Sequence, residues 1–254
     1  MNNISYFISD LHLKPAKNEF DQQNYFSFVE LIKQKFFEEN VLNIFILGDL
    51  FDFWWEYTYY IPKHFFELLL LLRELRLKGK QIYYFAGNHD FYLGNFFKDF
   101  IGMNVINDSL EIKLNDKTYY MTHGDGLAKS DTGYRILKKI LRNKFNQKLF
   151  KIIHPDLSMK IALLLSKTSR QVNYKNFEKF DHTEYIEWAI DFLKSKDDID
   201  NIIIGHTHKE LIKPLGKDKI FINLGPWLFE RKYYVLEEDR IYSFTYKKWR
   251  DDES

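Results

Sequence analysis

The chain has 254 residues, with 37 Lys and Arg against 36 Asp and Glu, and therefore a formal net charge of +1. This length is enough for one large domain with a substantial core. The balanced charge argues against a protein that coats nucleic acid, because that mode of binding needs a broad excess of basic residues. The absence of cysteine excludes disulfides, thiolate zinc sites and a thiol nucleophile, and is compatible with a reducing cytosol.

Neither a secretory signal nor a membrane-spanning segment is recognisable. Residues 1–10 contain no basic region followed by an apolar one. The longest apolar stretch, residues 65–72, is interrupted by Glu67 and is far shorter than the roughly 20 residues that a transmembrane helix needs. We therefore expect a chain that does not cross a membrane.

Short stretches rich in β-branched and aromatic residues alternate with helical patterns, which predicts an α/β (α+β) fold. Strands are expected at residues 4–9, 42–47, 81–86, 118–122, 201–204, 220–223, 232–236 and 241–246. Helices are expected at residues 25–39 and 64–78, and Gly79 follows the second in the position of a C-terminal cap. The last three strands follow one another closely, which predicts hairpins or a meander.

Residues 126–180 interrupt this alternation with a mostly helical pattern, and we expect them to be an insertion into a core formed by residues 1–125 and 181–254. Thirteen Lys and Arg against three Asp and Glu give the segment a net charge of +10, so the rest of the chain carries −9. Apolar residues recur every four positions at Leu137, Leu141, Phe145 and Leu149, and a second helix is expected at residues 159–167. A basic amphipathic helix of this kind suits an anionic membrane surface. The alternative is a helical hairpin that packs on the core and exposes a solvated basic face.

Each of the first five predicted strands ends in a polar cluster. The clusters are Asp10-Leu-His12, Gly48-Asp49-Leu-Phe-Asp52, Gly87-Asn88-His89-Asp90, His123-Gly124-Asp125 and Gly205-His206-Thr207-His208. Ligands of open α/β sheets bind at the carboxyl ends of the strands, so the five clusters are expected to form one site. A single Gly-Asp or Asp-x-His is often an ordinary turn, but five clusters in this order leave little room for that explanation.

The residue types in these clusters predict the chemistry. Carboxylate, imidazole and amide groups without thiolate suit Mn²⁺, iron or Zn²⁺. Seven candidate ligands are too many for one ion but suit two ions that share a bridging carboxylate. Such a pair lowers the pKa of a bridging water and binds the attacking and leaving oxygens of a displacement at phosphorus. The pattern therefore predicts two-metal hydrolysis of a phosphoester.

The five clusters resemble the signature of the calcineurin-like metallophosphoesterase superfamily, which implies a two-sheet β-sandwich flanked by helices. By this resemblance, one metal would be bound by Asp10, His12 and His208. The other would be bound by Asn88, His123 and His206, with Asp49 as the bridge. His89 would contact the phosphoryl oxygen or protonate the leaving group, Asn88 and His206 would stabilise the developing charge, and Asp52 would orient His89. The alternative role for Asp52 is a helix N-cap.

Protein phosphatases of this superfamily usually carry an arginine directly after the second Asp of Gly-Asp-x-x-Asp, where this chain has Phe53. Residues 48–54 and 123–126 and the helical insertion instead resemble the branch that hydrolyses UDP-2,3-diacylglucosamine to UMP and 2,3-diacylglucosamine 1-phosphate in lipid A biosynthesis. Well-known members of that branch have Arg where this chain has His89. The resemblance implies substrate contacts from Asn88, His89, Asp131, Arg135, Ser169, Asn173, Lys175 and His206.

We therefore expect a metal-dependent phosphoester or pyrophosphate hydrolase that uses two divalent ions, Mn²⁺ above all, and acts on a nucleotide-sugar lipid. It is expected in the cytoplasm, as a peripheral protein of the inner membrane, without a required protein or nucleic-acid partner. One alternative is a metallophosphoesterase of other specificity, such as a nucleotide or general phosphodiesterase. The other is a non-catalytic scaffold of the same fold, which the presence of all seven ligands disfavours. A nuclease is disfavoured by the −9 outside the insertion.

Overall fold

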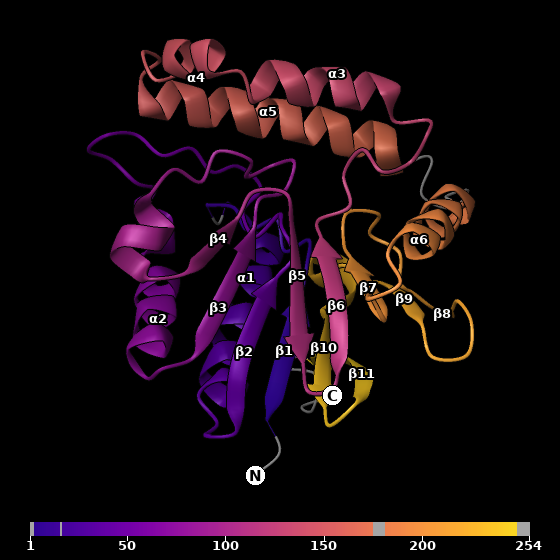
Figure 1. The fold of residues 1–254 in the computed structure, drawn as a ribbon. Helices are drawn as coiled ribbons and strands as arrows, with labels where there is room; N and C mark the ends of the chain where they lie inside the picture. Colours follow the sequence, from indigo (N-terminus) through magenta and orange to yellow (C-terminus); the bar gives the residue numbers. More distant parts are fainter. Residues whose placement is uncertain (1–2, 16, 175–180, 248–254) are drawn as a thin grey trace.

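The computed structural model describes residues 3–15, 17–174 and 181–247. Two β-sheets pack against each other, helices cover their outer faces, and a layer of three helices lies across one end (Figure 1). This arrangement confirms the predicted two-sheet α/β architecture with flanking helices.

The first sheet has the strand order β11-β10-β1-β2-β3-β4. Its strands are β1 (Ile4–Ile8), β2 (Val41–Ile46), β3 (Gln81–Phe85), β4 (Asn104–Ile106), β10 (Lys232–Glu237) and β11 (Arg240–Thr245). Strands β1 to β4 are parallel, and β10 and β11 form an antiparallel hairpin beside β1. The carboxyl ends of β1, β2 and β3 therefore meet at one edge.

The second sheet has the order β5-β6-β7-β9-β8, with β6, β7 and β9 parallel in its centre. Its strands are β5 (Ser109–Leu114), β6 (Lys117–Thr122), β7 (Asn201–Ile204), β8 (Leu211–Pro214) and β9 (Ile220–Asn223). The predicted meander of the last three strands is wrong, because β9 pairs with β7 in this sheet while β10 and β11 pair in the other. The predicted hairpin holds for β10 and β11 only.

Large apolar side chains fill the space between the sheets, where Phe7 and Phe45 stack with ring centroids 4.9 Å apart and meet Met121 and Ile203 of the second sheet. The alternation of β1 sends Phe7 to this interface and the neighbouring Ile8 toward the helices on the other face. Burial of each such side chain contributes about 1.5–3 kcal/mol. The two sheets thus hold their strand ends in a common frame.

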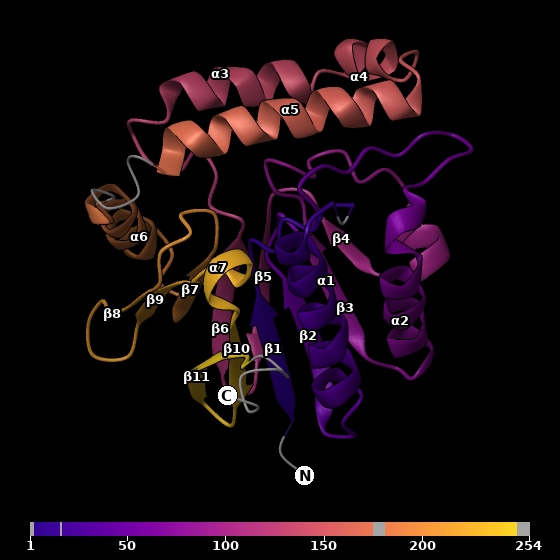
Figure 2. The ribbon, with the colours of Figure 1, turned by 180° about the vertical axis from the view of Figure 1, so that it is seen from behind.

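Helices α1 (Glu19–Leu31) and α2 (Phe66–Leu77) cover the outer face of the first sheet (Figure 2), and α6 (Thr183–Ser195) packs on the second. Helix α1 begins earlier than predicted because Asn18 Oδ1 caps it, accepting a hydrogen bond from Asp21 N at 2.8 Å. Helix α1 continues as a π-helical turn (Ile32–Phe36), and a 3₁₀ turn (Lys63–Phe65) precedes α2. Two further short helical segments are a π-helical turn (Phe97–Ile101) and α7 (Trp227–Glu230). Gly79 has φ +86°, which confirms the predicted C-terminal cap of α2.

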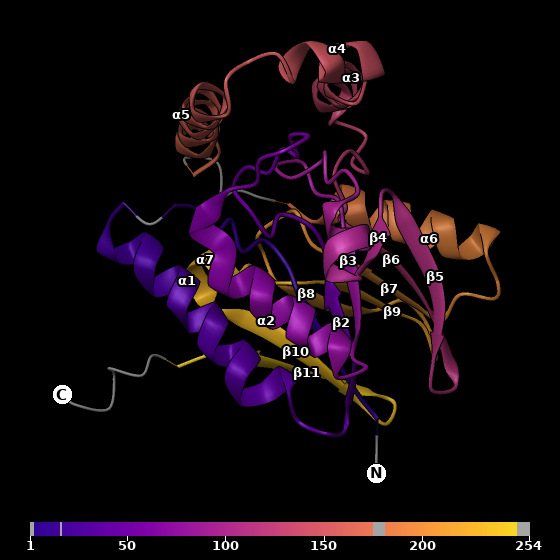
Figure 3. The same cartoon turned by 90° about the vertical axis from the view of Figure 1, so that its left-hand side faces the viewer.

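Helices α3 (Thr132–Leu141), α4 (Lys144–Phe150) and α5 (Pro155–Tyr174), here called the cap, lie across the end of the molecule to which the parallel strands point (Figure 3). Their helical character was predicted, and the expected helix at residues 159–167 lies within the longer α5. No helix in the described ranges combines the length and the apolar character that crossing a bilayer requires.

Candidate active site

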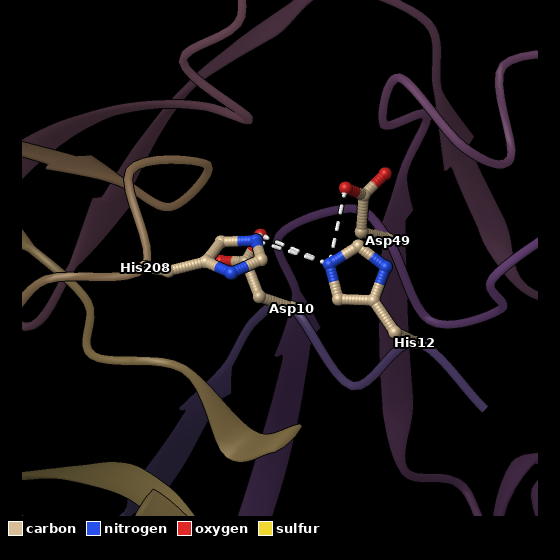
Figure 4. Close-up of side chains that lie close together, drawn as sticks. All are labelled: Asp10, His12, Asp49 and His208. Carbon is tan, nitrogen blue, oxygen red and sulfur yellow. Dashed lines mark hydrogen bonds and ion pairs between the residues drawn. The ribbon is translucent and has the colours of Figure 1, made fainter. Parts of the chain in front are cut away.

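The five polar clusters meet beneath the cap, at the carboxyl ends of β1, β2, β3, β6 and β7. Figure 4 shows Asp10, His12, Asp49 and His208 pointing toward one another. Asp10, His12 and Asp49 are fully buried, and His208 is partly so. The structure thus brings together side chains that are distant in the chain, such as His12 and His208, which are 196 positions apart.

Four side chains form a first group. Nε2 of His12 lies 3.0 Å from Nε2 of His208, and Oδ1 of Asp10 lies 3.2 Å from the same atom of His208. Oδ2 of Asp49 is 3.6 Å from Nε2 of His12. One atom from each of the four side chains therefore faces a shared point.

A second group lies on the other side of Asp49. Oδ1 of Asn88 is 3.0 Å from Nε2 of His123 and 2.9 Å from Nδ1 of His206. Oδ2 of Asp49 is 3.6 Å from Nε2 of His123, the same distance as to the His12 ring of the first group. Asp49 therefore stands between the two groups, where a bridging carboxylate must stand.

The backbone at these positions adopts a conformation that few residues accept. Five of the candidate ligands have left-handed φ angles between +47° and +71°: Asp10, His12, Asp49, His206 and His208. Each such residue costs on the order of 1–3 kcal/mol, and strain of this kind clusters at functional sites. The strand ends thus use unfavourable turns to direct several side chains to one place.

Two glycines permit the close approach of neighbouring loops. A Cβ atom on Gly87 would lie 2.1 Å from Oδ1 of Asp49, and one on Gly205 would lie 1.9 Å from Oγ of Ser9. Both distances are far shorter than any real contact. The glycines of the Gly-Asn-His-Asp and Gly-His-Thr-His clusters are therefore required for packing around the ligands.

The sequence profile of calcineurin-like phosphoesterases matches residues 6–210, a span that contains all five clusters. The chain belongs to this family. The phosphoesterase is 28% identical to a UDP-2,3-diacylglucosamine hydrolase of Porphyromonas gingivalis, over 93% of this chain and 95% of that one. It is 31% identical to the hydrolase of that name from Haemophilus influenzae, over 96% and 98% of the two chains. A solved dimetal phosphatase from Danio rerio aligns over 96% of this chain and 99% of that one, with 14% identity and a TM-score of 0.47.

The donor set of the phosphoesterase fits divalent metal ions. Oδ1 of Asp10 is buried and accepts no hydrogen bond of good geometry from the described residues, although Nε2 of His208 lies 3.2 Å away. Nε2 of His12 and Nε2 of His208 lie 3.0 Å apart, at hydrogen-bonding distance when one of them is protonated, and a cation between them can replace that proton. Nitrogen and oxygen ligands without sulfur suit Mn²⁺, iron or Zn²⁺. The family and this cluster together identify the protein as a metal-dependent hydrolase.

Hydrogen bonds outside the groups orient their members. Nδ1 of His123 donates to the Leu47 carbonyl oxygen at 2.7 Å, which leaves Nε2 to face the site. Oδ2 of Asp10 accepts from the His206 backbone N–H at 3.0 Å, and Oδ1 of Asp49 accepts from the His89 backbone N–H at 2.9 Å. Each carboxylate thus keeps one oxygen for the backbone and turns the other toward the imidazoles.

The electrostatics of the side chains favour ligand binding. Burial lowers the pKa of both His12 and His206 to about 4, so these rings are neutral near pH 7. Burial alone would lower the pKa of His123 too, but the Asp49 carboxylate raises it to about 10. Burial would raise the pKa of Asp49, yet the neighbouring imidazoles hold it well below its usual range. A divalent cation can replace the proton that Asp49 favours on His123.

Asp52 and His89 form a further pair at the mouth of the site. Oδ1 of Asp52 lies 3.6 Å from Nδ1 of His12 and 3.7 Å from Nδ1 of His89. Nδ1 of His89 donates to the backbone carbonyl of Asp52 at 3.0 Å, and its side chain is 17% exposed. No helix begins after Asp52, because the next helical turn starts at Lys63, so the N-cap alternative is wrong.

Asp90 has a role that the sequence analysis did not assign. Its buried carboxylate accepts hydrogen bonds from the backbone N–H groups of Asp49, Phe51 and Gly87, at 3.1, 3.2 and 2.9 Å, and from the Tyr84 hydroxyl. Burial and the Asp49 charge raise the pKa of Asp90 to about 6. Asp90 thereby joins the loops after β2 and β3. The sequence signal that could have indicated this role is the position of Asp90 at the end of the Gly-Asn-His-Asp cluster.

Of the expected substrate residues, Asn88, His89 and His206 belong to the two groups of candidate ligands and the adjoining Asp52–His89 pair, here called the floor. The others that the structure describes, Asp131, Arg135, Ser169 and Asn173, lie in or beside the cap. Arg135 donates to the carbonyl oxygens of Ala128 at 2.6 Å and Lys129 at 3.0 Å, so its guanidinium holds the loop before α3. Asp131 lies at the start of α3, and its Oδ2 is buried. Ser169 and Asn173 lie in α5, and Lys175 lies outside the described residues.

Proposed function

We propose that the phosphoesterase hydrolyses the pyrophosphate of UDP-2,3-diacylglucosamine to UMP and 2,3-diacylglucosamine 1-phosphate. The observation that carries this proposal is a set of exposed apolar side chains on the cap, the layer of helices that lies across the end of the molecule where the candidate ligands meet (Figure 3). The names of the relatives, which align over nearly their whole length, support the same substrate.

The exposed apolar side chains recur on all three cap helices and the loop between α4 and α5. They are Ile136, Ile140, Phe145, Leu149, Ile152, Leu157 and Leu164, with Phe145 73% and Ile152 79% exposed. Apolar side chains gathered this densely on a surface mark a binding site for lipid or protein. The acyl chains of such a substrate would cover these side chains and remove their apolar surface from water.

Lys139 of α3 is exposed, but the other basic side chains of α3 and of its C-cap are engaged rather than fully solvated. Arg135 binds backbone carbonyls, Lys138 lies 2.6 Å from the Asp125 carboxylate, and Arg142 lies 2.8 Å from the Asp108 carboxylate. Other cap lysines, such as Lys144 and Lys148, are exposed beside the apolar residues. A surface of this composition suits an anionic membrane, so we place the protein in the cytoplasm, bound peripherally to the inner membrane.

In the proposed site, one divalent ion would be held by Asp10, His12 and His208. The other would be held by Asn88, His123 and His206, and Asp49 would be shared by both. Two ions of this kind, with Mn²⁺ as our expectation, supply Lewis acidity and lower the pKa of water. Because the Asp10 and Asp49 carboxylates are held by backbone N–H groups, the ligands are oriented before binding.

His89 is the proposed proton-transfer residue. Its Nδ1 is engaged by the Asp52 carbonyl, so its Nε2 is the atom that meets the phosphoryl oxygen or the leaving group. Asp52 lies close enough to orient both His89 and His12. Asn88 and His206 stabilise the charge that develops at phosphorus. We further propose that Asp131, Arg135, Ser169, Asn173 and Lys175 contact the nucleotide-sugar head group.

The test is a comparison of three substrates with the purified full chain and Mn²⁺: UDP-2,3-diacylglucosamine, UDP-glucose and bis(4-nitrophenyl) phosphate. We expect rapid UMP release from the acylated substrate, none from UDP-glucose, and slow turnover of the small diester. Equal turnover of UDP-glucose and the acylated substrate would instead identify a general nucleotide phosphodiesterase.

A further inference from the structure

One buried carboxylate joins the floor of the site to the cap. Asp125 lies two residues after His123 and is only 7% exposed. Its Oδ2 accepts a hydrogen bond from the Tyr134 hydroxyl at 2.8 Å and lies 2.6 Å from Nζ of Lys138. Tyr134 and Lys138 are one turn apart on α3 and therefore lie on the same side of that helix. A single oxygen thus holds two successive turns of α3.

In the described part of the chain, the other hydrogen bonds and ion pairs of α3 are made away from the candidate ligands. Arg135 binds carbonyls of residues 126–129, which belong to the loop leading into the helix itself. At the far end, Arg142 pairs with Asp108, whose side chain is 79% exposed. A pair as exposed as this contributes little, about 0–1 kcal/mol. Among the described contacts, Asp125 therefore provides the buried, charge-assisted link between α3 and the strand end that carries His123.

This link fixes where α3 stands over the ligands. The Tyr134 ring centroid is 6.1 Å from that of His206, so the helix side held by Asp125 borders the floor directly. A displacement of about 1 Å in a substrate-positioning element can cost on the order of 100-fold in rate. A small diester can reach the floor without cap contacts, whereas a substrate with acyl chains must be held by the cap.

We propose that Asp125 is a positioning residue that sets the affinity for the acylated substrate by holding α3, through Tyr134 and Lys138, over the ligand floor. The proposal rests on the function proposed above. It assigns Asp125 no proton transfer and no metal contact. A substitution of Asp125 should therefore affect the large acylated substrate more than a small diester. A substitution that disturbs the ligand floor would affect both substrates alike.

The experiment compares Asp125→Asn, Lys138→Met and the double variant with the matched control Lys139→Met, an exposed lysine one position along α3. KM and kcat are measured with UDP-2,3-diacylglucosamine and with bis(4-nitrophenyl) phosphate. We expect each single variant to raise KM for the acylated substrate about tenfold, with less than about threefold change in kcat/KM for the diester. The KM of the double variant should be no higher than about that of the more affected single variant, because both substitutions remove the same ion pair.

An equal loss with both substrates in Asp125→Asn would show that Asp125 acts on the floor and would overturn the proposal. An unchanged KM in both single variants would overturn it as well. If the parent enzyme cleaves the diester but not the acylated substrate, the proposed function fails while the link remains testable. Hydrogen exchange of the α3 amides should then be faster in Asp125→Asn and Lys138→Met than in Lys139→Met, and equal exchange in all three would sink the idea.

Discussion

The ligand floor and the cap are built on opposite physical principles. On the floor, most of the polar side chains are buried, several sit on strained backbone, and their carboxylates are held by backbone N–H groups. On the cap, large apolar side chains are exposed. The floor is suited to chemistry that demands fixed geometry. The cap is suited to a substrate whose apolar part is flexible and needs no fixed geometry. Changes on the floor should therefore abolish turnover of every substrate, and changes on the cap should alter only the choice among them.

Asp49→Ala is expected to have the largest effect, because Asp49 Oδ2 is 3.6 Å from an imidazole nitrogen of each group. We expect at least about a 1,000-fold loss of kcat with the acylated substrate and with the diester alike. Metal content, measured by mass spectrometry of the purified protein, should fall below that of the parent. Asp218→Ala, an exposed carboxylate in the turn before β9, is the control. Near-normal turnover in Asp49→Ala would refute the bridging position.

His89→Ala should lower kcat by about 100-fold without changing metal content, because His89 lies beside the candidate ligands and is the proposed proton-transfer residue. His89→Arg should lose less, since a guanidinium can also contact a phosphoryl oxygen. Steady-state kinetics with the diester and a metal assay separate the two effects. A His89→Ala variant that loses its metal would show that His89 belongs to the ligand set.

Gly87→Ala should weaken metal binding about tenfold, because a Cβ atom there would overlap Oδ1 of Asp49. The control is Gly79→Ala, where φ is +86° but no atom lies within 4 Å of the added Cβ. The control should lose about 1 kcal/mol of unfolding free energy and keep its metal affinity. Titration with Mn²⁺ and thermal unfolding distinguish the outcomes. If both variants bind Mn²⁺ equally well, the close packing around Asp49 is not needed.

Phe145→Ser should have the smallest effect, and only the acylated substrate should show it. Removing one exposed apolar side chain should raise KM for UDP-2,3-diacylglucosamine about threefold to tenfold and leave diester hydrolysis unchanged. Leu77→Ser is the matched control, because Leu77 is 71% exposed at the end of α2, away from the cap (Figure 1). A similar change of KM in both variants would show that the cap surface does not select the substrate.

Much of the fold was predictable because its signals are local. The polar clusters mark the strand ends, and the predicted boundaries of β7 and β9 match the structure. Strands β4, β5 and β8 were not predicted. All three lie at sheet edges, β4 is only three residues long, and β5 and β8 are largely exposed, so that they lack a continuous apolar stretch. Helix α6 was not predicted either, although Tyr185, Ala189 and Leu193 recur every four residues on its buried side.

The sequence by itself determined the chemistry, because residue type decides which groups can bind a metal, and the order of the clusters shows that they share a site. Only the tertiary structure decided the distances that place Asp49 between two groups of ligands. It also decided the direction in which α3 faces. Periodicity separates the apolar and basic sides of a helix, but which side meets the body depends on partners distant in the chain. For Lys138 that partner is Asp125, so a basic residue points inward while Ile136 and Ile140 remain exposed.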